Sequence, residues 1–210
     1  MKWMLTLLAA ALFGGCTLTR EVPPVQSYHL ETNAAIEALA GECGGRVVRV
    51  ALIEAPQWLN GTAIYYSAAD RKMYRYTRSR WEEPPVEQLQ QIVQNSLVAS
   101  ALFDGVIPYR SLAKYDWLLE IRVEKMMQHI DGAGQGTTEL KLYADLVDGY
   151  SRRILAQKAF GYRQKSALGD AQSAVAAWSR SSGVFAGELV RWLQQQCTLH
   201  PKPDRSDVDL

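Results

Sequence analysis

The second half of the chain contains two segments in which apolar and polar residues alternate. In residues 116–129 the aliphatic side chains Leu119, Ile121 and Val123 alternate with charged ones, and residues 138–148 repeat the pattern. A period of two gives a β-strand one apolar face. The glycine-rich DGAGQG between the segments suits a hairpin tip. The sequence therefore predicts long antiparallel strands that bury one face of a sheet.

Two other segments have the spacing of amphipathic helices. The first follows Pro84 and Pro85, which cost nothing at a helix start, and we expect Gly105 to stop it. The second covers residues 170–196 and carries a single apolar stripe. The positions at helical spacing are Val86, Leu89, Val93 and Leu97 in the first helix, and Val175, Trp178, Phe185, Leu189 and Trp192 in the second. We expect both stripes to face the core.

The remaining strand patterns are shorter or less regular. They cover residues 28–30, 46–53, 62–67, 72–77 and 153–164, and residues 62–67 and 72–77 form a predicted hairpin. Residues 33–45 are expected to be a loop or one to two helical turns, and residues 54–61 a turn-rich connection. Runs of strands with two helices that can share one face predict an α+β fold. The expected architecture is a mixed, mostly antiparallel sheet with two helices packed on one face.

Length and charge narrow the class of protein. A chain of 210 residues suits one domain with tails. Its 23 basic and 22 acidic residues leave a net charge of +1, which gives no electrostatic reason to expect a nucleic-acid partner. The sequence contains none of the common hydrolase, phosphate-loop or dinucleotide-binding motifs. We therefore expect a non-enzymatic protein without a cofactor.

The N-terminus, MKWMLTLLAAALFGGC, indicates export. A lysine precedes an apolar run over residues 3–13, which is shorter than the roughly 20 residues that span a bilayer and is typical of a signal peptide. LFGGC resembles the lipobox of bacterial lipoproteins, in which the cysteine is acylated and becomes the first residue. Leucine stands one place further from Cys16 than usual. The alternative is an ordinary secretory signal with a chance cysteine.

This interpretation divides the chain into four parts. Residues 1–15 are the predicted signal peptide, 16–27 a linker, 28–199 the folded domain and 200–210 a disordered tail. Cys16 is the predicted lipid attachment site. Thr17 follows it, and the resemblance to bacterial sorting signals then implies the outer membrane, with the domain facing the periplasm.

Cys43 and Cys197 remain once Cys16 is assigned. In an oxidising compartment an even pair of cysteines favours a disulfide, while two buried free thiols are the alternative. A metal site is not expected, because the sequence has no CxxC pair and its three histidines lack ligand spacing.

Residues 55–89 read APQWLNGTAIYYSAADRKMYRYTRSRWEEPPVEQL. Their motifs resemble, in order and spacing, those of the ABC-type transport auxiliary lipoprotein family: a Pro-x-Trp-Leu turn, a tyrosine-bearing strand, a strand ending in Trp81, and a helix that opens with prolines and carries a Gln-Leu pair. The lipobox, Tyr28-x-Leu30 and the closing helix also fit. The resemblance covers nearly the whole mature chain.

The resemblance implies a function in lipid transport. Members of this family accompany MCE-domain proteins and ABC permeases that move lipids between bacterial membranes, so these are the expected partners, together with the membrane and, as a possibility, further copies of this chain. The alternatives are a lipoprotein assembly factor or scaffold for another envelope complex, and a lipid-binding carrier.

Three residues are candidate partner contacts. Trp58 and Leu59 lie in the turn-rich connection, and Tyr66 in the strand that follows it. An aromatic residue beside leucine is a good interface anchor, but the same pair can fold back over the sheet edge. Tyr65 and Tyr66 point to opposite faces of their strand, so at most one of them is expected in the core.

Overall fold

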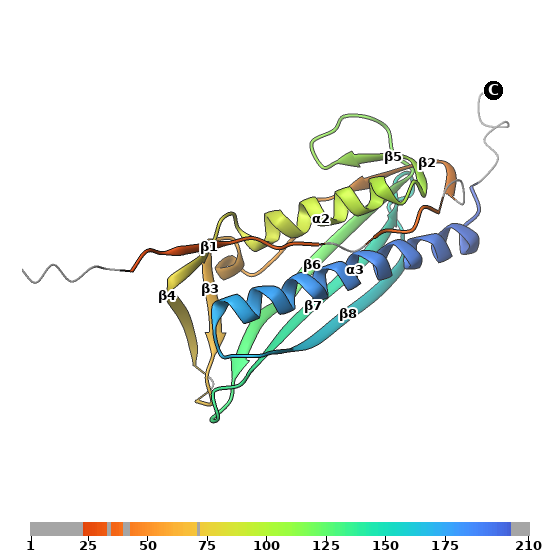
Figure 1. Ribbon diagram of the computed structural model, residues 1–210. Helices are drawn as coiled ribbons and strands as arrows, with labels where there is room; N and C mark the ends of the chain where they lie inside the picture. Colours follow the sequence, from red (N-terminus) through yellow and green to blue (C-terminus); the bar gives the residue numbers. More distant parts are fainter. Residues whose placement is uncertain (1–22, 33–34, 40–42, 71, 203–210) are drawn as a thin grey trace, which may run out of the picture.

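The computed structural model describes residues 23–32, 35–39, 43–70 and 72–202 (Figure 1). The predicted signal peptide and Cys16 lie outside these ranges. Within them, no helix combines the length and the apolar character that crossing a bilayer requires. The strands, the helices and the core side chains of the described residues lie between Gln26 and Leu199.

Three long strands build the antiparallel part of the sheet: β6 (Trp117–Ile130), β7 (Gly136–Asp148) and β8 (Ile154–Ser166). β7 pairs with β6 on one edge and with β8 on the other. The alternating side chains of β6 and β7 are buried: Leu119, Ile121, Val123, Leu140, Leu142, Ala144 and Leu146. The predicted alternation and the hairpin between β6 and β7 are confirmed.

The other edge of β6 is shared by two smaller groups of strands. Its first residues pair in parallel with β2 (Cys43–Val50), which in turn pairs in parallel with β5 (Phe103–Pro108). Its last residues pair in parallel with β3 (Ala63–Ser67), which forms an antiparallel hairpin with β4 (Met73–Trp81). β1 (Gln26–Tyr28) lies parallel to β4 and completes the eight-stranded mixed sheet.

Helices α2 (Pro85–Ala99) and α3 (Ala171–Leu199) lie on one face of this sheet (Figure 1). α3 contacts β7 and β8, while α2 contacts α3 and β5. Every residue of the two predicted apolar stripes is buried. Asp170 caps α3 by accepting the Ser173 N–H at 2.7 Å. The predicted α+β fold with two helices on one face is confirmed.

The predicted helix stop at Gly105 is wrong. α2 ends at Ala99, where the Ser100 hydroxyl donates to the Leu97 carbonyl oxygen at 2.7 Å and Ala101 adopts a left-handed φ of 49°. Gly105 lies inside β5, a strand that we did not expect. A Cβ there would lie 3.4 Å from the Val47 side chain, which is ordinary contact, so this glycine neither stops the helix nor is required by the packing of the strand.

Two early elements begin before their predicted positions. β1 covers Gln26–Tyr28 instead of 28–30, and β2 begins at Cys43 instead of Arg46. Residues 35–39, described within the expected loop or helical turns, have no regular structure. β2 therefore brings Cys43 into the core, where its sulfur is bonded to that of Cys197 with the two Cα atoms 5.3 Å apart.

Candidate functional site

An extended segment between β1 and β2 crosses the outside of the helical layer (Figure 1). We call the described residues 29–32 and 35–39 the strap. The Leu30 N–H donates to Gln88 Oε1 on α2 at 2.6 Å, and the Glu31 N–H to Ser179 Oγ on α3 at 3.1 Å. The Leu39 N–H donates to the Ser100 carbonyl oxygen at 2.7 Å. The strap is thus fastened by its backbone to both helices.

The Gln88 side chain on α2 binds two backbone groups at once. Its side chain is buried, and its Nε2 donates to the Glu83 carbonyl oxygen at 2.6 Å while its Oε1 holds the strap. Leu30 is also buried, against the core. A glutamine can satisfy both groups because its amide is donor and acceptor at once. In the sequence, the Gln-Leu pair is a motif of the family resemblance, but it does not indicate that Gln88 binds the strap.

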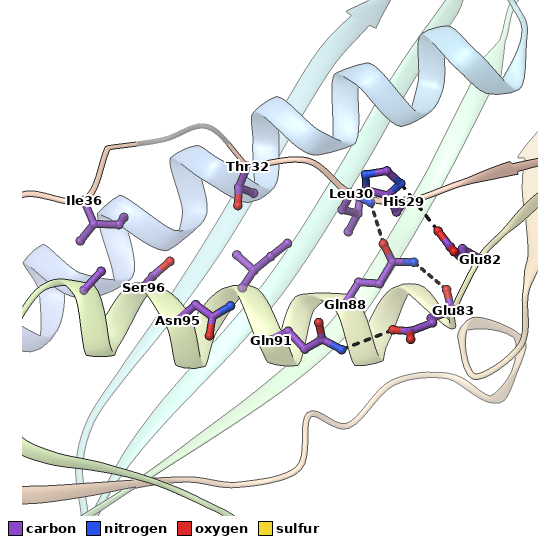
Figure 2. A pocket seen from close by; sticks show the side chains of 12 residues that line it. His29, Leu30, Thr32, Ile36, Glu82, Glu83, Gln88, Gln91, Asn95 and Ser96 are labelled. Atoms are coloured by element: carbon purple, nitrogen blue, oxygen red, sulfur yellow. Dashed lines mark hydrogen bonds and ion pairs between the residues drawn. The ribbon is translucent and has the colours of Figure 1, made fainter.

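A groove of about 580 Å³ lies between the strap and α2 (Figure 2). Ile92 and Leu30 supply apolar surface, while Gln91 and Asn95 add amide groups. Glu82 and Glu83 make one end acidic, and His29 lies 3.8 Å from the Glu82 carboxylate. The groove therefore offers backbone-binding amides, an apolar floor and negative charge at one end.

A second groove, of about 1000 Å³, lies between the strap and α3. Its floor includes small and aliphatic residues of α3, among them Ala176, Gly183 and Gly187. Arg180 and Arg191 also line it, and no carboxylate of the described residues lies within ion-pair distance of either guanidinium. The two arginines lie 11 positions apart, about 16 Å along the helix and on the same side of it.

The three candidate contact residues lie in and after the 3₁₀ turn η2 (Gln57–Leu59). Leu59 is 3% exposed and belongs to the core, so its side chain is not available at the surface. Trp58 is half-buried and packs edge-on against Tyr65, with ring centroids 5.6 Å apart. The Trp58 side chain therefore folds back on β3, which was the second of the two expected arrangements.

Tyr66 belongs to a cluster of tyrosines on the β3–β4 hairpin. Its ring centroid lies 5.5 Å from that of Tyr74 and 4.7 Å from that of Tyr76. The Tyr76 hydroxyl donates to Gln128 Oε1 at 2.6 Å, and burial raises the pKa of that hydroxyl. Tyr66 is half-buried. The structure brings Tyr66 onto a rigid aromatic surface but does not join it to Trp58, which packs on Tyr65.

A buried carboxylate lies on the opposite face of the sheet from the helices. Glu139 Oε2 is 2.8 Å from Lys125 Nζ and 3.2 Å from His129 Nε2, and Arg163 and Lys141 lie near its other oxygen. Burial raises the pKa of Glu139, but the hydrogen bond and charge of Lys125, with help from His129 and Arg163, outweigh it and lower that pKa to about 2.

His129 also bonds to Ser67, whose Oγ lies 2.6 Å from His129 Nδ1. Serine, histidine and carboxylate thus form a chain, the connectivity of a hydrolytic triad. The carboxylate is, however, already shared by three cations, which weakens its attraction for an imidazolium. The two ring nitrogens also have exchanged roles relative to the usual triad. The chemistry of this cluster favours a structural role that joins β3, β6, β7 and β8.

The C-terminal end of α3 and the residues after it are joined to β2. Besides the disulfide, the Arg46 guanidinium donates to the His200 carbonyl oxygen and Lys202 Nζ to that of Gly45. Lys202 also lies 3.9 Å from the Asp116 carboxylate. These contacts fix the C-terminal end of α3 against β2.

Among the described residues, no three potential ligands cluster as a metal site would require.

Comparison with known proteins agrees with this architecture. A crystal structure of a protein from Xanthomonas campestris superposes with a TM-score of 0.74 over 83% of this chain and 98% of its own, at 18% identity. A second, of an uncharacterised protein, has a TM-score of 0.62, 14% identity, and coverage of 81% and 99%. At these identities the likeness shows a common fold. No curated protein matches the sequence.

The sequence itself carries the family assignment. The model of the family described as "ABC-type transport auxiliary lipoprotein component" matches residues 28–190. That range begins at the last residue of β1 and ends within α3, so it includes the strap, the groove along α2, most of the groove along α3 and the strands from β2 to β8. The chain belongs to the ABC-type transport auxiliary lipoprotein component family.

Proposed function

We propose that this protein is an outer-membrane lipoprotein that faces the periplasm and serves as a non-catalytic accessory component of an MCE/ABC-type intermembrane lipid transport system. The observation that supports it most is the family match over residues 28–190, preceded by a lipobox-like sequence that ends in Cys16. An accessory component of a transporter acts by binding and position, and the grooves and aromatic surfaces of this fold suit that role.

The predicted lipid anchor determines where the domain acts. Acylation gives about 0.8 kcal/mol per buried methylene, and two or more chains make attachment stable. The chain between Cys16 and the first strand, at Gln26, can extend by at most about 3.5 Å per residue, roughly 35 Å in all. A domain held this close to the membrane meets its partners at a high effective concentration.

The helical face supplies the docking surface in this proposal. The groove between the strap and α2 has amides at Gln91 and Asn95, next to a glutamine that already binds extended backbone. Trp58 and Tyr66 add aromatic surface on the hairpin side of the sheet. Through these surfaces the domain would hold or cap the lipid conduit formed by the MCE-domain protein and its permease.

Photo-crosslinking in membranes tests the partner. A crosslinking amino acid is placed at Asn95, in the groove, or at Trp58, and at the exposed Thr77 of β4 as the matched control. We expect the groove and Trp58 positions to capture an MCE-domain protein and the control to capture none. Capture of only a β-barrel protein would favour the assembly-factor alternative, and capture of only unrelated envelope proteins would reject both.

A second candidate function is a lipid carrier, favoured by the groove along α3. Its small apolar residues leave room for an acyl chain, and the unpaired guanidiniums of Arg180 and Arg191 suit a phosphate. Native mass spectrometry of residues 17–210, which contain the described strands and helices, tests this function. A bound phospholipid that is lost in Arg180→Ala/Arg191→Ala supports the carrier, and a ligand-free mass rejects it.

A further inference from the structure

Two neighbouring loops expose apolar side chains at the end of the sheet where β6 begins. The β5–β6 loop (109–116) carries Leu112, which is 100% exposed, and the β7–β8 turn (149–153) carries Tyr150, which is 90% exposed. The loops touch, because the Gly149 N–H donates to the Asp116 carbonyl oxygen at 2.8 Å. Tyr109 is also among the exposed apolar residues of the first loop. We call these two loops the tip.

Both loops are held in shape from within. In the first, the Arg49 guanidinium donates to the Ser111 and Ala113 carbonyl oxygens and lies 4.0 Å above the Tyr115 ring. In the turn, Asp148 Oδ1 accepts the backbone N–H groups of Tyr150 and Ser151. A braced loop that holds leucine entirely in water gains nothing from that exposure within its own fold. Together, the exposed apolar side chains of two touching loops form a group of the kind that marks a binding surface.

The tip is also strongly basic. Arg110 and Lys114 in the loop and Arg152 and Arg153 in the turn are exposed, and no carboxylate of the described residues lies within ion-pair distance of any of them. The nearby acidic residues bond to the backbone: Asp116, in the first loop, accepts the Val47 N–H at 2.9 Å, and Asp148, at the end of β7, accepts N–H groups of the turn. The outward charge of the tip is therefore positive.

We propose that the tip docks on an anionic phospholipid bilayer. Leucine standing among tyrosines and basic residues matches the layers of a bilayer surface: hydrocarbon, interface and phosphate. The shape favours a bilayer over a protein, because a protein hot spot fills a pocket in a partner, whereas these side chains project singly from loops. The grooves along α2 and α3 are lined by residues outside both loops.

The position of the tip would determine how the domain is oriented on the membrane. β1, where the chain arrives from the predicted anchor, lies at the opposite end of the long axis from β2 and β5, beside which the tip lies (Figure 1). With the lipid anchor of the proposed function at one end and the tip bound at the other, the long axis lies along the membrane. The tip contact itself does not depend on the anchor or on any partner protein.

Vesicle sedimentation with the unacylated chain, residues 17–210, tests the proposal without anchor or partner. We expect binding to mixed phosphatidylglycerol–phosphatidylcholine vesicles, little binding to phosphatidylcholine alone, and release by salt. Each cation near an anionic surface is worth about a fivefold gain in partitioning. Arg110→Glu/Arg153→Glu should therefore weaken binding more than twentyfold, and Leu112→Glu should weaken it as well.

Arg75→Glu/Arg78→Glu is the matched control. Both arginines are exposed on β4, outside the two loops of the tip, and no carboxylate of the described residues lies within ion-pair distance of either. Circular dichroism confirms that each variant is folded. Equal loss in the control and tip variants, or no preference for anionic vesicles, overturns the proposal. So does unchanged vesicle binding in a tip variant that has lost crosslinking to a protein, because the tip would then be a protein contact.

Discussion

The Gln128 amide joins one end of the sheet to the start of α3, because its Nε2 donates to the carbonyl oxygen of the helix cap Asp170 at 3.3 Å. It is completely buried, its Oε1 accepts the Tyr76 hydroxyl, and its Nε2 donates to Ser166 Oγ at 2.9 Å. Gly136 leaves the space that this network needs. A Cβ at Gly136 would lie 2.6 Å from Gln128 Nε2 and closer still to Ser166 Oγ.

Gly136→Ala should therefore destabilise the fold by about 2 kcal/mol, the usual cost of overpacking a buried site. Urea denaturation followed by circular dichroism measures the loss. Gly161→Ala on β8 is the control, because a Cβ there meets nothing within 4 Å. If both variants unfold at the same urea concentration as the parent, the network around Gln128 is looser than described.

Glu139 makes the stability depend on pH. Its pKa of about 2 is below the ordinary value of 4.5, so its ion pairs stabilise the fold above about pH 4.5 and are lost as pH falls toward 2. Lys125, His129, Lys141 and Arg163 face it. Glu139→Gln should cost about 3 kcal/mol at neutral pH and flatten the acid limb of the stability curve.

Stability measured from pH 7 to pH 2 checks this prediction. Glu120→Gln, which neutralises an exposed carboxylate on β6, is the control and should follow the parent protein. An acid limb that stays the same in Glu139→Gln would mean that other carboxylates carry the pH dependence.

At the scale of elements, the strap depends on one side chain of α2. Gln88→Ala removes the acceptor of the Leu30 N–H. We expect the free energy of local opening of the strap to fall by about 1–2 kcal/mol, so that the strap opens more often. Hydrogen exchange at the strap amides measures the change. Gln91→Ala is the control, since that side chain bonds to Glu83 Oε2, at 3.3 Å, and to none of the described residues of the strap. Equal exchange in both variants would show that Leu30 packing alone holds the strap.

The disulfide connects β2 to the end of α3 across 154 positions of sequence. In the chain-entropy model a loop of that length contributes about 4–5 kcal/mol. Reductant should therefore lower the denaturation midpoint of the parent protein strongly, and leave that of Cys43→Ala/Cys197→Ala unchanged. A midpoint of the parent that is insensitive to reductant would contradict a structural disulfide.

Some elements could be predicted from the sequence because they bury one face over many residues. The alternation in β6 and β7 and the stripes of α2 and α3 each repeat a period several times. β5 has the sequence FDGVIP, too short and too mixed to show a period. β2 and β3 pair in parallel with β6 through connections that pass over other elements. The residue pattern of a single strand does not indicate which strand it pairs with.

The candidate site was only partly predictable for the same reason. The cysteine pair followed from counting and compartment, and Trp58 was identified as a residue with two possible arrangements. The strap, the grooves and the Glu139 cluster join residues that are far apart in sequence, such as Glu31 with Ser179. Polar residues of this kind carry no periodic signal, so only the folded chain shows what they contact.

At the scale of the whole molecule, the proposed function depends on where the domain is held relative to the membrane. In the proposed function, a domain joined through a short linker to an acylated Cys16 acts on whatever reaches the membrane that holds it. The anchor and the tip also differ in their response to salt. Burial of acyl chains resists salt, whereas contacts between cations and lipid phosphates are screened by it.

Membrane fractionation of Cys16→Ser cells after a high-salt wash tests this account most directly. The parent protein should stay with the outer membrane, and the variant should appear in the soluble periplasmic fraction and fail to complement a deletion strain in outer-membrane lipid asymmetry. A variant that stays in the washed membranes and complements fully would contradict the account.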